Sequence, residues 1–372
     1  MQKSFPMTHT ELAVAKQLTP LAAQMLHAKK QLEAVAFRGM LSLRELDAPE
    51  VEIVALAKGA AVHDLGWLRR VAVRGEDRFR WLSGMVTNTV NDLTPATGAW
   101  NLVLNAQGRI QGDLTVWRST DTLELEIASD QYDRLLAHLE HFIIMDDVEL
   151  VPLAEETALG LTGPLADEVL HRLGLPTLAD PQTSVQVEWN GFDLRIVRGY
   201  GVLGLHYEFW VPLAGMSKLW KFLCTAGAVP VGCASLDAFR IAEGTPEYGV
   251  DMVERDLPQE TSQLRALSFS KGCYLGQEIV ERIRSRGSVH RHLRSLEIVG
   301  PIPVGGTELT FDGGKAAGNI TSAAELNLPS GKRIVALGMI RGEAELRNLP
   351  LAYSMEGVEG SAQMLAGAIS LE

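Results

Sequence analysis

The stretch from Val185 to Ile196 constrains the fold of this chain more than any other. Apolar and polar residues alternate on both sides of Asn190-Gly191. Asn-Gly adopts the positive φ angles that a type I′ turn requires, and period-two alternation is typical of a half-buried strand. The stretch therefore predicts a β-hairpin, and with it a sheet of antiparallel strands.

Segments on both sides of the hairpin indicate the fold class. Apolar residues alternate with glutamates over residues 123–127, which predicts a further strand. Helical spacing of apolar residues begins at Tyr132, in a helix predicted to end near Asp146, and recurs over residues 216–223. The order strand, helix, strands, helix favours an α+β fold, in which helices cover antiparallel sheets, over a doubly wound parallel sheet.

The two ends of the chain differ from this pattern. Residues 9–35 have helical spacing with a break at Pro20, so we predict a helical N-terminal extension over residues 1–48. After residue 293 the chain is rich in glycine, and glycine pairs separate short apolar runs. This pattern predicts a small C-terminal β-barrel domain over residues 293–372.

Composition excludes several classes of protein. The chain has 34 Lys and Arg against 46 Asp and Glu, a net charge of −12, which argues against a protein that coats nucleic acid. Its three cysteines are scattered and odd in number, so a disulfide scaffold is excluded and a reducing compartment is indicated. We find no secretory signal and no run of about 20 apolar residues that could span a membrane. We therefore expect a soluble cytoplasmic protein that makes no contact with membranes.

The segment from Lys271 to Glu278, KGCYLGQE, is the strongest candidate for chemistry. Cys273 lies between two glycines and before an apparent helix, and Lys271 precedes it by two residues. A thiol near a helix N-terminus and cationic side chains has a lowered pKa, which favours the reactive thiolate. The alternative is a small buried cysteine in a strand-to-helix turn, since free cysteine is among the most buried residue types.

Residues 282–294 form a basic segment in an otherwise acidic chain. Its cationic and imidazole side chains are those of Arg282, Arg284, Arg286, His290, Arg291, His292 and Arg294. The segment is a candidate anion site, for a phosphate backbone or for a polycarboxylate such as oligoglutamate. The alternative is a solvated basic face that balances nearby acids. The two histidines share a strand face but lack a third ligand, so we expect no metal site.

A loop rich in glycine and proline precedes these two segments. It contains Tyr248-Gly249-Val250-Asp251 and Leu257-Pro258-Gln259-Glu260. Loops with acidic side chains often hold ligands, although a single aspartate or glutamate is more often a turn or cap residue. Glycines elsewhere match neither a Rossmann fingerprint nor a P-loop, so neither kind of nucleotide site is predicted.

In this order, the segments resemble the aminomethyltransferase superfamily of folate-binding proteins, to which the T-protein of the glycine-cleavage system belongs. The resemblance covers roughly residues 60–345 and depends on HDLGWLRRVAVRGEDRFRWLSGMVTNTVNDL, NAQGRIQGDL, RIAEGTPEYGVDM, QET and GNITSA. Within the superfamily, KGCYLGQE resembles the signature of the YgfZ family, bacterial folate-binding proteins associated with iron–sulfur enzymes and tRNA modification. The resemblance implies three small domains around a central channel for tetrahydrofolate, with two interleaved α+β domains over residues 49–292.

The resemblance also implies roles for individual residues. Glu260, in the Pro-x-Glu stretch, is expected to bind the pterin edge, because a carboxylate accepts two parallel hydrogen bonds from an amidine-like N–H pair. Asp251 and Tyr248 match the Tyr-Gly-x-Asp motif, which we expect near the same channel. Arg282 and Arg291 are expected to bind the acidic tail of the folate.

One departure from the T-proteins concerns activity. T-proteins carry an Asp-Asp pair where this chain has Gly112-Asp113, and the first aspartate of that pair is the catalytic one. Glycine has no side chain that could orient or deprotonate a substrate. This departure argues against classical aminomethyl transfer.

These observations lead to three hypotheses that share tetrahydrofolate, or a one-carbon derivative of it, as the cofactor. The first is a folate-binding accessory protein that assists assembly or repair of iron–sulfur clusters in client enzymes, including tRNA-modifying ones, with Cys273 as the reactive group and Lys271 beside it. The second is a folate-dependent one-carbon transferase or demethylase that acts on an amine. The third is a folate-binding protein without chemistry of its own. None of them requires direct contact with tRNA.

Overall fold

Two sheets form the larger part of the molecule. The computed structural model describes residues 17–28, 31–369 and 371. The first sheet has the strand order β10 (Thr183–Trp189), β11 (Phe192–Arg198), β12 (His206–Pro212), β9 (Glu156–Thr162), β3 (Ala61–Asp64) and β13 (Val229–Pro230). The second sheet has the order β5 (Gly98–Leu104), β6 (Ile110–Arg118), β7 (Leu123–Ala128), β4 (Leu68–Arg74) and β8 (Glu149–Pro152).

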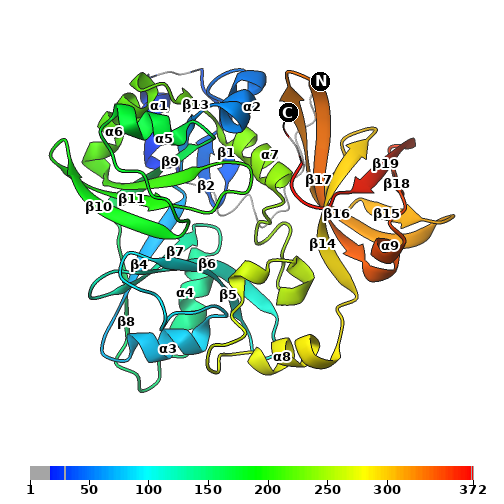
Figure 1. The fold of residues 1–372 in the computed structure, drawn as a ribbon, viewed down its shortest axis with the longest axis horizontal. Coiled ribbons are helices and arrows are strands. Elements are labelled where there is room, and N and C mark those ends of the chain that lie inside the picture. Colours follow the sequence, from blue (N-terminus) through cyan, green and yellow to red (C-terminus); the bar gives the residue numbers. More distant parts are fainter. Residues whose placement is uncertain (1–16, 29–30, 370, 372) are drawn as a thin grey trace.

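A closed barrel forms the C-terminal part of the fold and lies beside the two sheets (Figure 1). Its strands follow the order β14 (Arg291–Val299), β17 (Gly331–Arg341), β16 (Lys315–Leu328), β15 (Glu308–Phe311), β18 (Leu351–Met355) and β19 (Val358–Met364). The short helix α9 (Gly342–Arg347) follows β17. The predicted α+β class and the predicted C-terminal barrel are both confirmed.

Helices cover the sheets because each buries an apolar stripe against a strand surface. On the first sheet, one core includes residues of α1 (Pro20–Ala28), α5 (Ala166–Arg172) and α6 (Leu213–Thr225). On the second sheet, the core includes α3 (Arg78–Met85) and α4 (Tyr132–Glu140). Helices α2 (Pro49–Lys58) and α7 (Cys233–Glu243) share a core with β16 and β17, so they connect the first sheet to the barrel (Figure 1).

Most of the local predictions are confirmed. The hairpin is β10–β11, with Trp189 opposite Phe192 and with φ angles of 53° at Asn190 and 83° at Gly191. The apparent helix after KGCYLGQE is α8 (Gln277–Arg286). Helix α4 ends at Glu140 rather than near residue 146, because the amides of the next turn bond three residues back and the chain leaves the helical path.

The predicted helical extension is wrong over part of its length. Residues 31–43 contain the hairpin β1 (Ala34–Phe37) and β2 (Met40–Leu43) in place of a helix. Its two-residue turn has φ angles of 50° at Arg38 and 83° at Gly39, and a Cβ at Gly39 would lie 2.4 Å from the amide nitrogen of Asp130. Arginine is an unusual turn residue, so the sequence lacked the usual hairpin signal. Residues 9–16 of the predicted helix lie outside the described residues.

Within the described part of the chain, no helix has both the length and the apolar character needed to cross a membrane.

Candidate functional site

A cavity of about 300 Å³ lies where the two sheets, helix α7 and the β1–β2 turn meet; we call it the central cavity. The first sheet contributes His63, Thr162, His206 and Glu208, and the second contributes Trp100, Asp113, Thr115 and Glu126. Aromatic side chains such as those of Trp67 and Phe239 complete the lining. A mostly apolar cavity with a few converging polar groups is the usual form of a small-molecule site.

Two glutamates form a buried acidic pair in the central cavity. Burial raises the pKa of the Glu208 carboxyl, and burial together with the negative charge of Glu208 raises the pKa of Glu126 well above its ordinary value. Glu126 Oε2 accepts a hydrogen bond from Trp117 Nε1 at 3.1 Å. Glu208 Oε2 is buried and accepts no hydrogen bond from an N–H or hydroxyl donor of the described residues, while the carboxyl of Glu126, when protonated, is a hydrogen-bond partner of Glu208. The cavity therefore contains a carboxylate oxygen that can accept a hydrogen bond from a ligand.

Two histidines, the buried His63 and the partly buried His206, lie next to this pair. The hydroxyl of Thr162 bridges His63 Nε2 at 2.9 Å and His206 Nδ1 at 2.8 Å, and His206 Nε2 lies 3.6 Å from Glu208 Oε1. Burial lowers the pKa of both imidazoles, that of His63 well below its ordinary value. A continuous polar chain thus connects His63 to Glu208.

Glycines make room for the two imidazole rings. A Cβ at Gly160, which is opposite His63 in the β3–β9 ladder, would lie 1.9 Å from His63 Cε1. A Cβ at Gly199 would lie 2.4 Å from His206 Cδ2. A larger residue at Gly160 or Gly199 would displace the imidazole rings, so glycine at these two positions allows the histidines to lie against the backbone.

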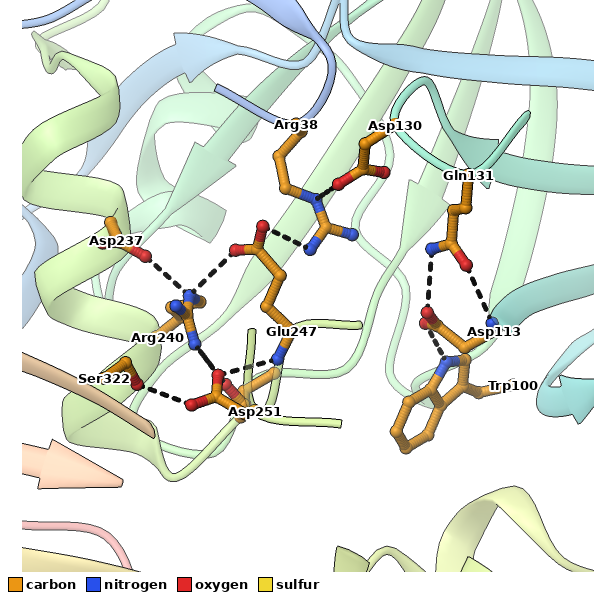
Figure 2. A network of polar contacts seen from close by, with 11 residues as sticks. Arg38, Trp100, Asp113, Asp130, Gln131, Asp237, Arg240, Glu247, Asp251 and Ser322 are labelled. Carbon is orange, nitrogen blue, oxygen red and sulfur yellow. Dashed lines mark hydrogen bonds and ion pairs between the residues drawn. The ribbon is translucent and has the colours of Figure 1, made fainter. Parts of the chain in front are cut away.

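Asp113 supplies a further carboxylate to the central cavity. Its Oδ2 accepts a hydrogen bond from Trp100 Nε1 at 2.8 Å and its Oδ1 accepts one from Gln131 Nε2 at 2.9 Å (Figure 2). Gly112 faces the opposite side of β6, where a Cβ would meet Gln131 and Leu135. Since successive residues of a strand point to opposite faces, the absence of a side chain at residue 112 does not leave the cavity without an acid.

An ion network borders the opposite side of the cavity (Figure 2). Glu247 lies between two arginines, 3.3 Å from Arg38 Nη1 and 3.3 Å from Arg240 Nε. Arg240 Nη1 also donates to Asp251 Oδ2 at 2.5 Å. The hairpin β1–β2, helix α7 and the loop after α7 are therefore held together by paired, buried charges, which are costly to break.

Comparison with known proteins identifies the family. The family model described as the GCVT N-terminal domain matches residues 15–271. The chain belongs to this family. This result confirms the predicted T-protein superfamily.

Individual relatives of this GCVT-family chain are distant in sequence. A chloroplastic protein of Arabidopsis thaliana named as a transferase is 26% identical over 289 residues; the match covers 75% of this chain and 65% of that protein. The aminomethyltransferase of Thermosipho melanesiensis is 25% identical over 341 residues, covering 89% of this chain and 93% of that protein.

A solved structure shares the fold. The glycine cleavage system aminomethyltransferase T of Bartonella henselae superimposes with a TM-score of 0.83 at 20% identity, and the match covers 96% of this chain and 99% of that one. The T-protein-like arrangement predicted from the sequence is confirmed.

None of the seven predicted site residues of this GCVT-family protein, all within the described part of the chain, lines the central cavity. Asp251 is buried and accepts hydrogen bonds from the hydroxyls of Thr321 at 2.5 Å and Ser322 at 2.7 Å, so it ties the loop to strand β16 of the barrel. Tyr248 is buried and its hydroxyl accepts a hydrogen bond from Arg134 at 3.0 Å. Asp251 lines a second cavity, between this loop and the barrel.

Glu260 and Arg291 form an ion pair away from the central cavity. Arg291 Nε lies 3.0 Å from Glu260 Oε1, and Arg291 Nη2 lies 2.7 Å from Asp256 Oδ1. Glu260 Oε2 accepts a hydrogen bond from the Leu257 amide at 2.9 Å, which caps the short helix η2 (Pro258–Thr261). Arg291 also lines this second cavity, of about 570 Å³, between the loop and the barrel.

The KGCYLGQE segment and α8 lie outside the central cavity. Lys271 Nζ donates to three carbonyls, those of Ser83, Val86 and Asn88, at 2.9, 2.6 and 2.7 Å. Burial lowers the pKa of Lys271 to about 8. Its amino group therefore anchors the segment to the chain after α3, while Cys273 and Arg282 are exposed.

The residues that the sequence interpretation missed come from strands. His206 and Glu208 are two residues apart in β12, whose remaining side chains are mostly apolar. Polar residues at this spacing share one face of a strand. This pattern was the available signal, but it did not show that His63 and Asp113, from β3 and β6, would face the same space.

Proposed function

We propose that the central cavity binds tetrahydrofolate or a one-carbon derivative of it. The observation that carries this proposal is Glu208, a buried carboxylate with an unpartnered oxygen in a cavity with aromatic lining. Such a carboxylate suits the amidine-like N–H pair of a pterin ring, and the aromatic side chains suit its flat faces. The role that the family resemblance assigned to Glu260 thus fits Glu208 better, since Glu260 is already paired with Arg291.

Titration calorimetry of the purified protein with 5-formyltetrahydrofolate tests the proposal. We expect saturable binding with one site per chain. A competing titration with folinate-free p-aminobenzoylglutamate separates recognition of the ring from recognition of the tail. Absence of saturable binding of 5-formyltetrahydrofolate at millimolar ligand would contradict folate binding.

We propose further that the protein has a YgfZ-type role, in which it assists assembly or repair of iron–sulfur clusters in client enzymes, including tRNA-modifying ones. Support comes from the match of KGCYLGQE to the YgfZ signature together with the exposure of Cys273. An exposed thiol that does not line the central cavity is accessible to a partner protein. Lys271 contributes by holding the segment in place through three carbonyls.

A complementation assay tests this role in a strain that lacks the protein. Cys273→Ala is expected to abolish support of iron–sulfur-dependent tRNA methylthiolation, while Cys224→Ala, at a partly buried cysteine of α6, is expected to retain it. Full activity of Cys273→Ala would remove the cysteine from the mechanism.

The second candidate function is a folate-dependent one-carbon transferase or demethylase that acts on an amine. Asp113 favours it, because its carboxylate lines the central cavity, the position from which an acid orients or deprotonates a substrate. The test is conversion of tetrahydrofolate to a methylene derivative by the purified protein in the presence of candidate amines. Turnover that Asp113→Asn abolishes would favour this function over the accessory role.

A further inference from the structure

Arg265 is clamped between two aromatic rings at the central cavity. It belongs to the short helix η3 (Leu264–Ala266). Its guanidinium carbon lies 4.6 Å from the ring centroid of Trp100 and 3.9 Å from that of Tyr200. Contact with two aromatic rings restricts the orientation of a guanidinium and leaves the N–H donors at its edge available.

The two carboxylates whose charges act on Arg265, those of Glu243 and Asp113, accept hydrogen bonds from other donors. Glu243 Oε1 accepts hydrogen bonds from the amides of Val202 and Leu203 at 2.9 and 3.0 Å. Both oxygens of Asp113 are also occupied, by Trp100 and by a glutamine amide.

The guanidinium itself makes little use of its donors. Its one side-chain hydrogen bond within the described residues is a long one, 3.4 Å, from Nε to Gln263 Oε1. The two terminal nitrogens, with four N–H donors, have no acceptor among the residues that the structure describes. The cavity thus presents an oriented, unpaired cation.

We propose that Arg265 binds a carboxylate of the ligand that occupies the central cavity. Glu208 is 8% exposed, whereas Tyr200, whose ring lies against Arg265, is 46% exposed. The cavity therefore has a hydrogen-bond acceptor at its buried end and a cation toward its open side. A ligand that fits both ends is elongated, with N–H donors at one end and an acidic group at the other.

This inference rests on the proposed function and deepens it, since the glutamate of a folate is such an acidic group. The basic segment 282–294 suits that role less well in the structure. Arg291 is paired with Glu260, Arg294 with Glu345, and Arg284 lies 3.4 Å from Glu281. Bidentate pairing with a carboxylate is the geometry for which a planar, pre-oriented arginine is suited.

The test compares two ligands on matched variants by titration calorimetry. The ligands are 5-formyltetrahydrofolate and the methylamide of 5-formyltetrahydropteroic acid, which keeps the ring system and the amide but has no carboxylate. The variants are Arg265→Gln, Arg265→Lys and, as the control, Arg80→Gln, at an arginine that is 69% exposed and outside the cavity. We expect Arg265→Gln to weaken binding of the glutamate-bearing ligand about 10- to 100-fold and to leave binding of the methylamide unchanged. Arg265→Lys retains the charge without the planar fork, so an intermediate loss is expected.

The outcomes separate the failure of this inference from the failure of the proposed function. If the wild-type protein binds both ligands equally, or if Arg265→Gln weakens both equally, Arg265 does not recognise the carboxylate although the cavity binds folate. If the wild-type protein binds neither ligand, the proposed function fails and the inference fails with it. Loss of the advantage of the glutamate-bearing ligand at 1 M salt would support a charge-based contact.

Discussion

The substitution Glu208→Gln tests the location of the ring-binding carboxylate. It keeps the shape of the side chain and removes its charge. A charge-assisted hydrogen bond contributes about 1.5–3 kcal/mol, so we expect binding of 5-formyltetrahydrofolate to weaken about 10- to 150-fold. Glu260→Gln is the matched comparison, because the sequence resemblance assigned the same role to that residue. It breaks the ion pair with Arg291 and should leave affinity within a factor of about two, at a cost of about 1–3 kcal/mol in stability.

The stability of Glu208→Gln should depend on pH in a defined direction. Because the pKa of the buried glutamate pair is raised in the folded protein, the folded state binds more protons than the unfolded state above the ordinary pKa of a glutamate. Wild-type stability therefore falls as the pH rises through the raised pKa values, by about 1.4 kcal/mol for each unit of pKa shift. Removing one of the two charges relieves this cost, so the variant should gain stability relative to the wild type between pH 5 and pH 8.

Calorimetric titration at pH 7.5 and thermal melting at pH 5 and pH 8 measure both effects. If Glu208→Gln binds as tightly as the wild type while Glu260→Gln binds weakly, the ring lies at the loop beside the barrel and the assignment of the central cavity is wrong. A stability difference that shrinks between pH 5 and pH 8 would refute the argument about the buried pair.

Three further predictions concern the framework of the site. Thr162→Val removes the hydroxyl between the imidazoles of His63 and His206 and should lower the free energy of unfolding, measured with urea, by about 1–3 kcal/mol. Thr157→Val, on the same strand, removes a buried hydroxyl without a partner and should not lower it. Equal losses of stability in the two variants would contradict the bridging role. Lys271→Met leaves three carbonyls without their donor and should lower the free energy of unfolding by about 2–4 kcal/mol. Cys273→Ala, at the exposed cysteine, should change it by less than about 0.5 kcal/mol. If Lys271→Met is as stable as the wild type, the lysine is not an anchor. Asp251→Ala leaves Arg240 and the hydroxyls of Thr321 and Ser322 without their acceptor. We expect the free energy of unfolding to fall by about 3–5 kcal/mol and proteolysis within residues 287–290 to become faster. An unchanged cleavage rate would show that Asp251 does not hold the barrel against the loop.

Individual motif residues show the limits of interpreting a sequence by its signatures. Asp251 and Glu260 were predicted to serve a ligand and Lys271 to act beside Cys273, and the structure gives each of them partners within the protein. A motif shows that a polar side chain is needed at a position. It does not show whether its partner is a ligand or the backbone.

The alternation of side chains along strand β6 decided which residue of Gly112-Asp113 faces the central cavity. The sequence interpretation placed the important position at residue 112, where glycine appeared to remove the acid. In the structure, Asp113 faces the cavity and Gly112 faces α4. The pairing of β5 with β6 also has a bulge between Val103 and Leu104. A shift of one residue exchanges the two faces of a strand, and the printed sequence does not show it.

The sequence by itself determined the local elements and the family. The hairpin at Asn190-Gly191 and the amphipathic helices follow from interactions between near neighbours, such as turn geometry and the period of apolar residues. The short strands of the barrel were also visible in the sequence, whereas the closure of the barrel depends on pairing of β14 with the distant β17 and β19. The tertiary structure decided which side chains share a cavity. His63, Asp113, Glu208 and Arg265 are far apart along the chain, and only the packing of two sheets against each other brings them to one space and leaves Glu208 and Arg265 with hydrogen-bonding capacity that the protein does not use.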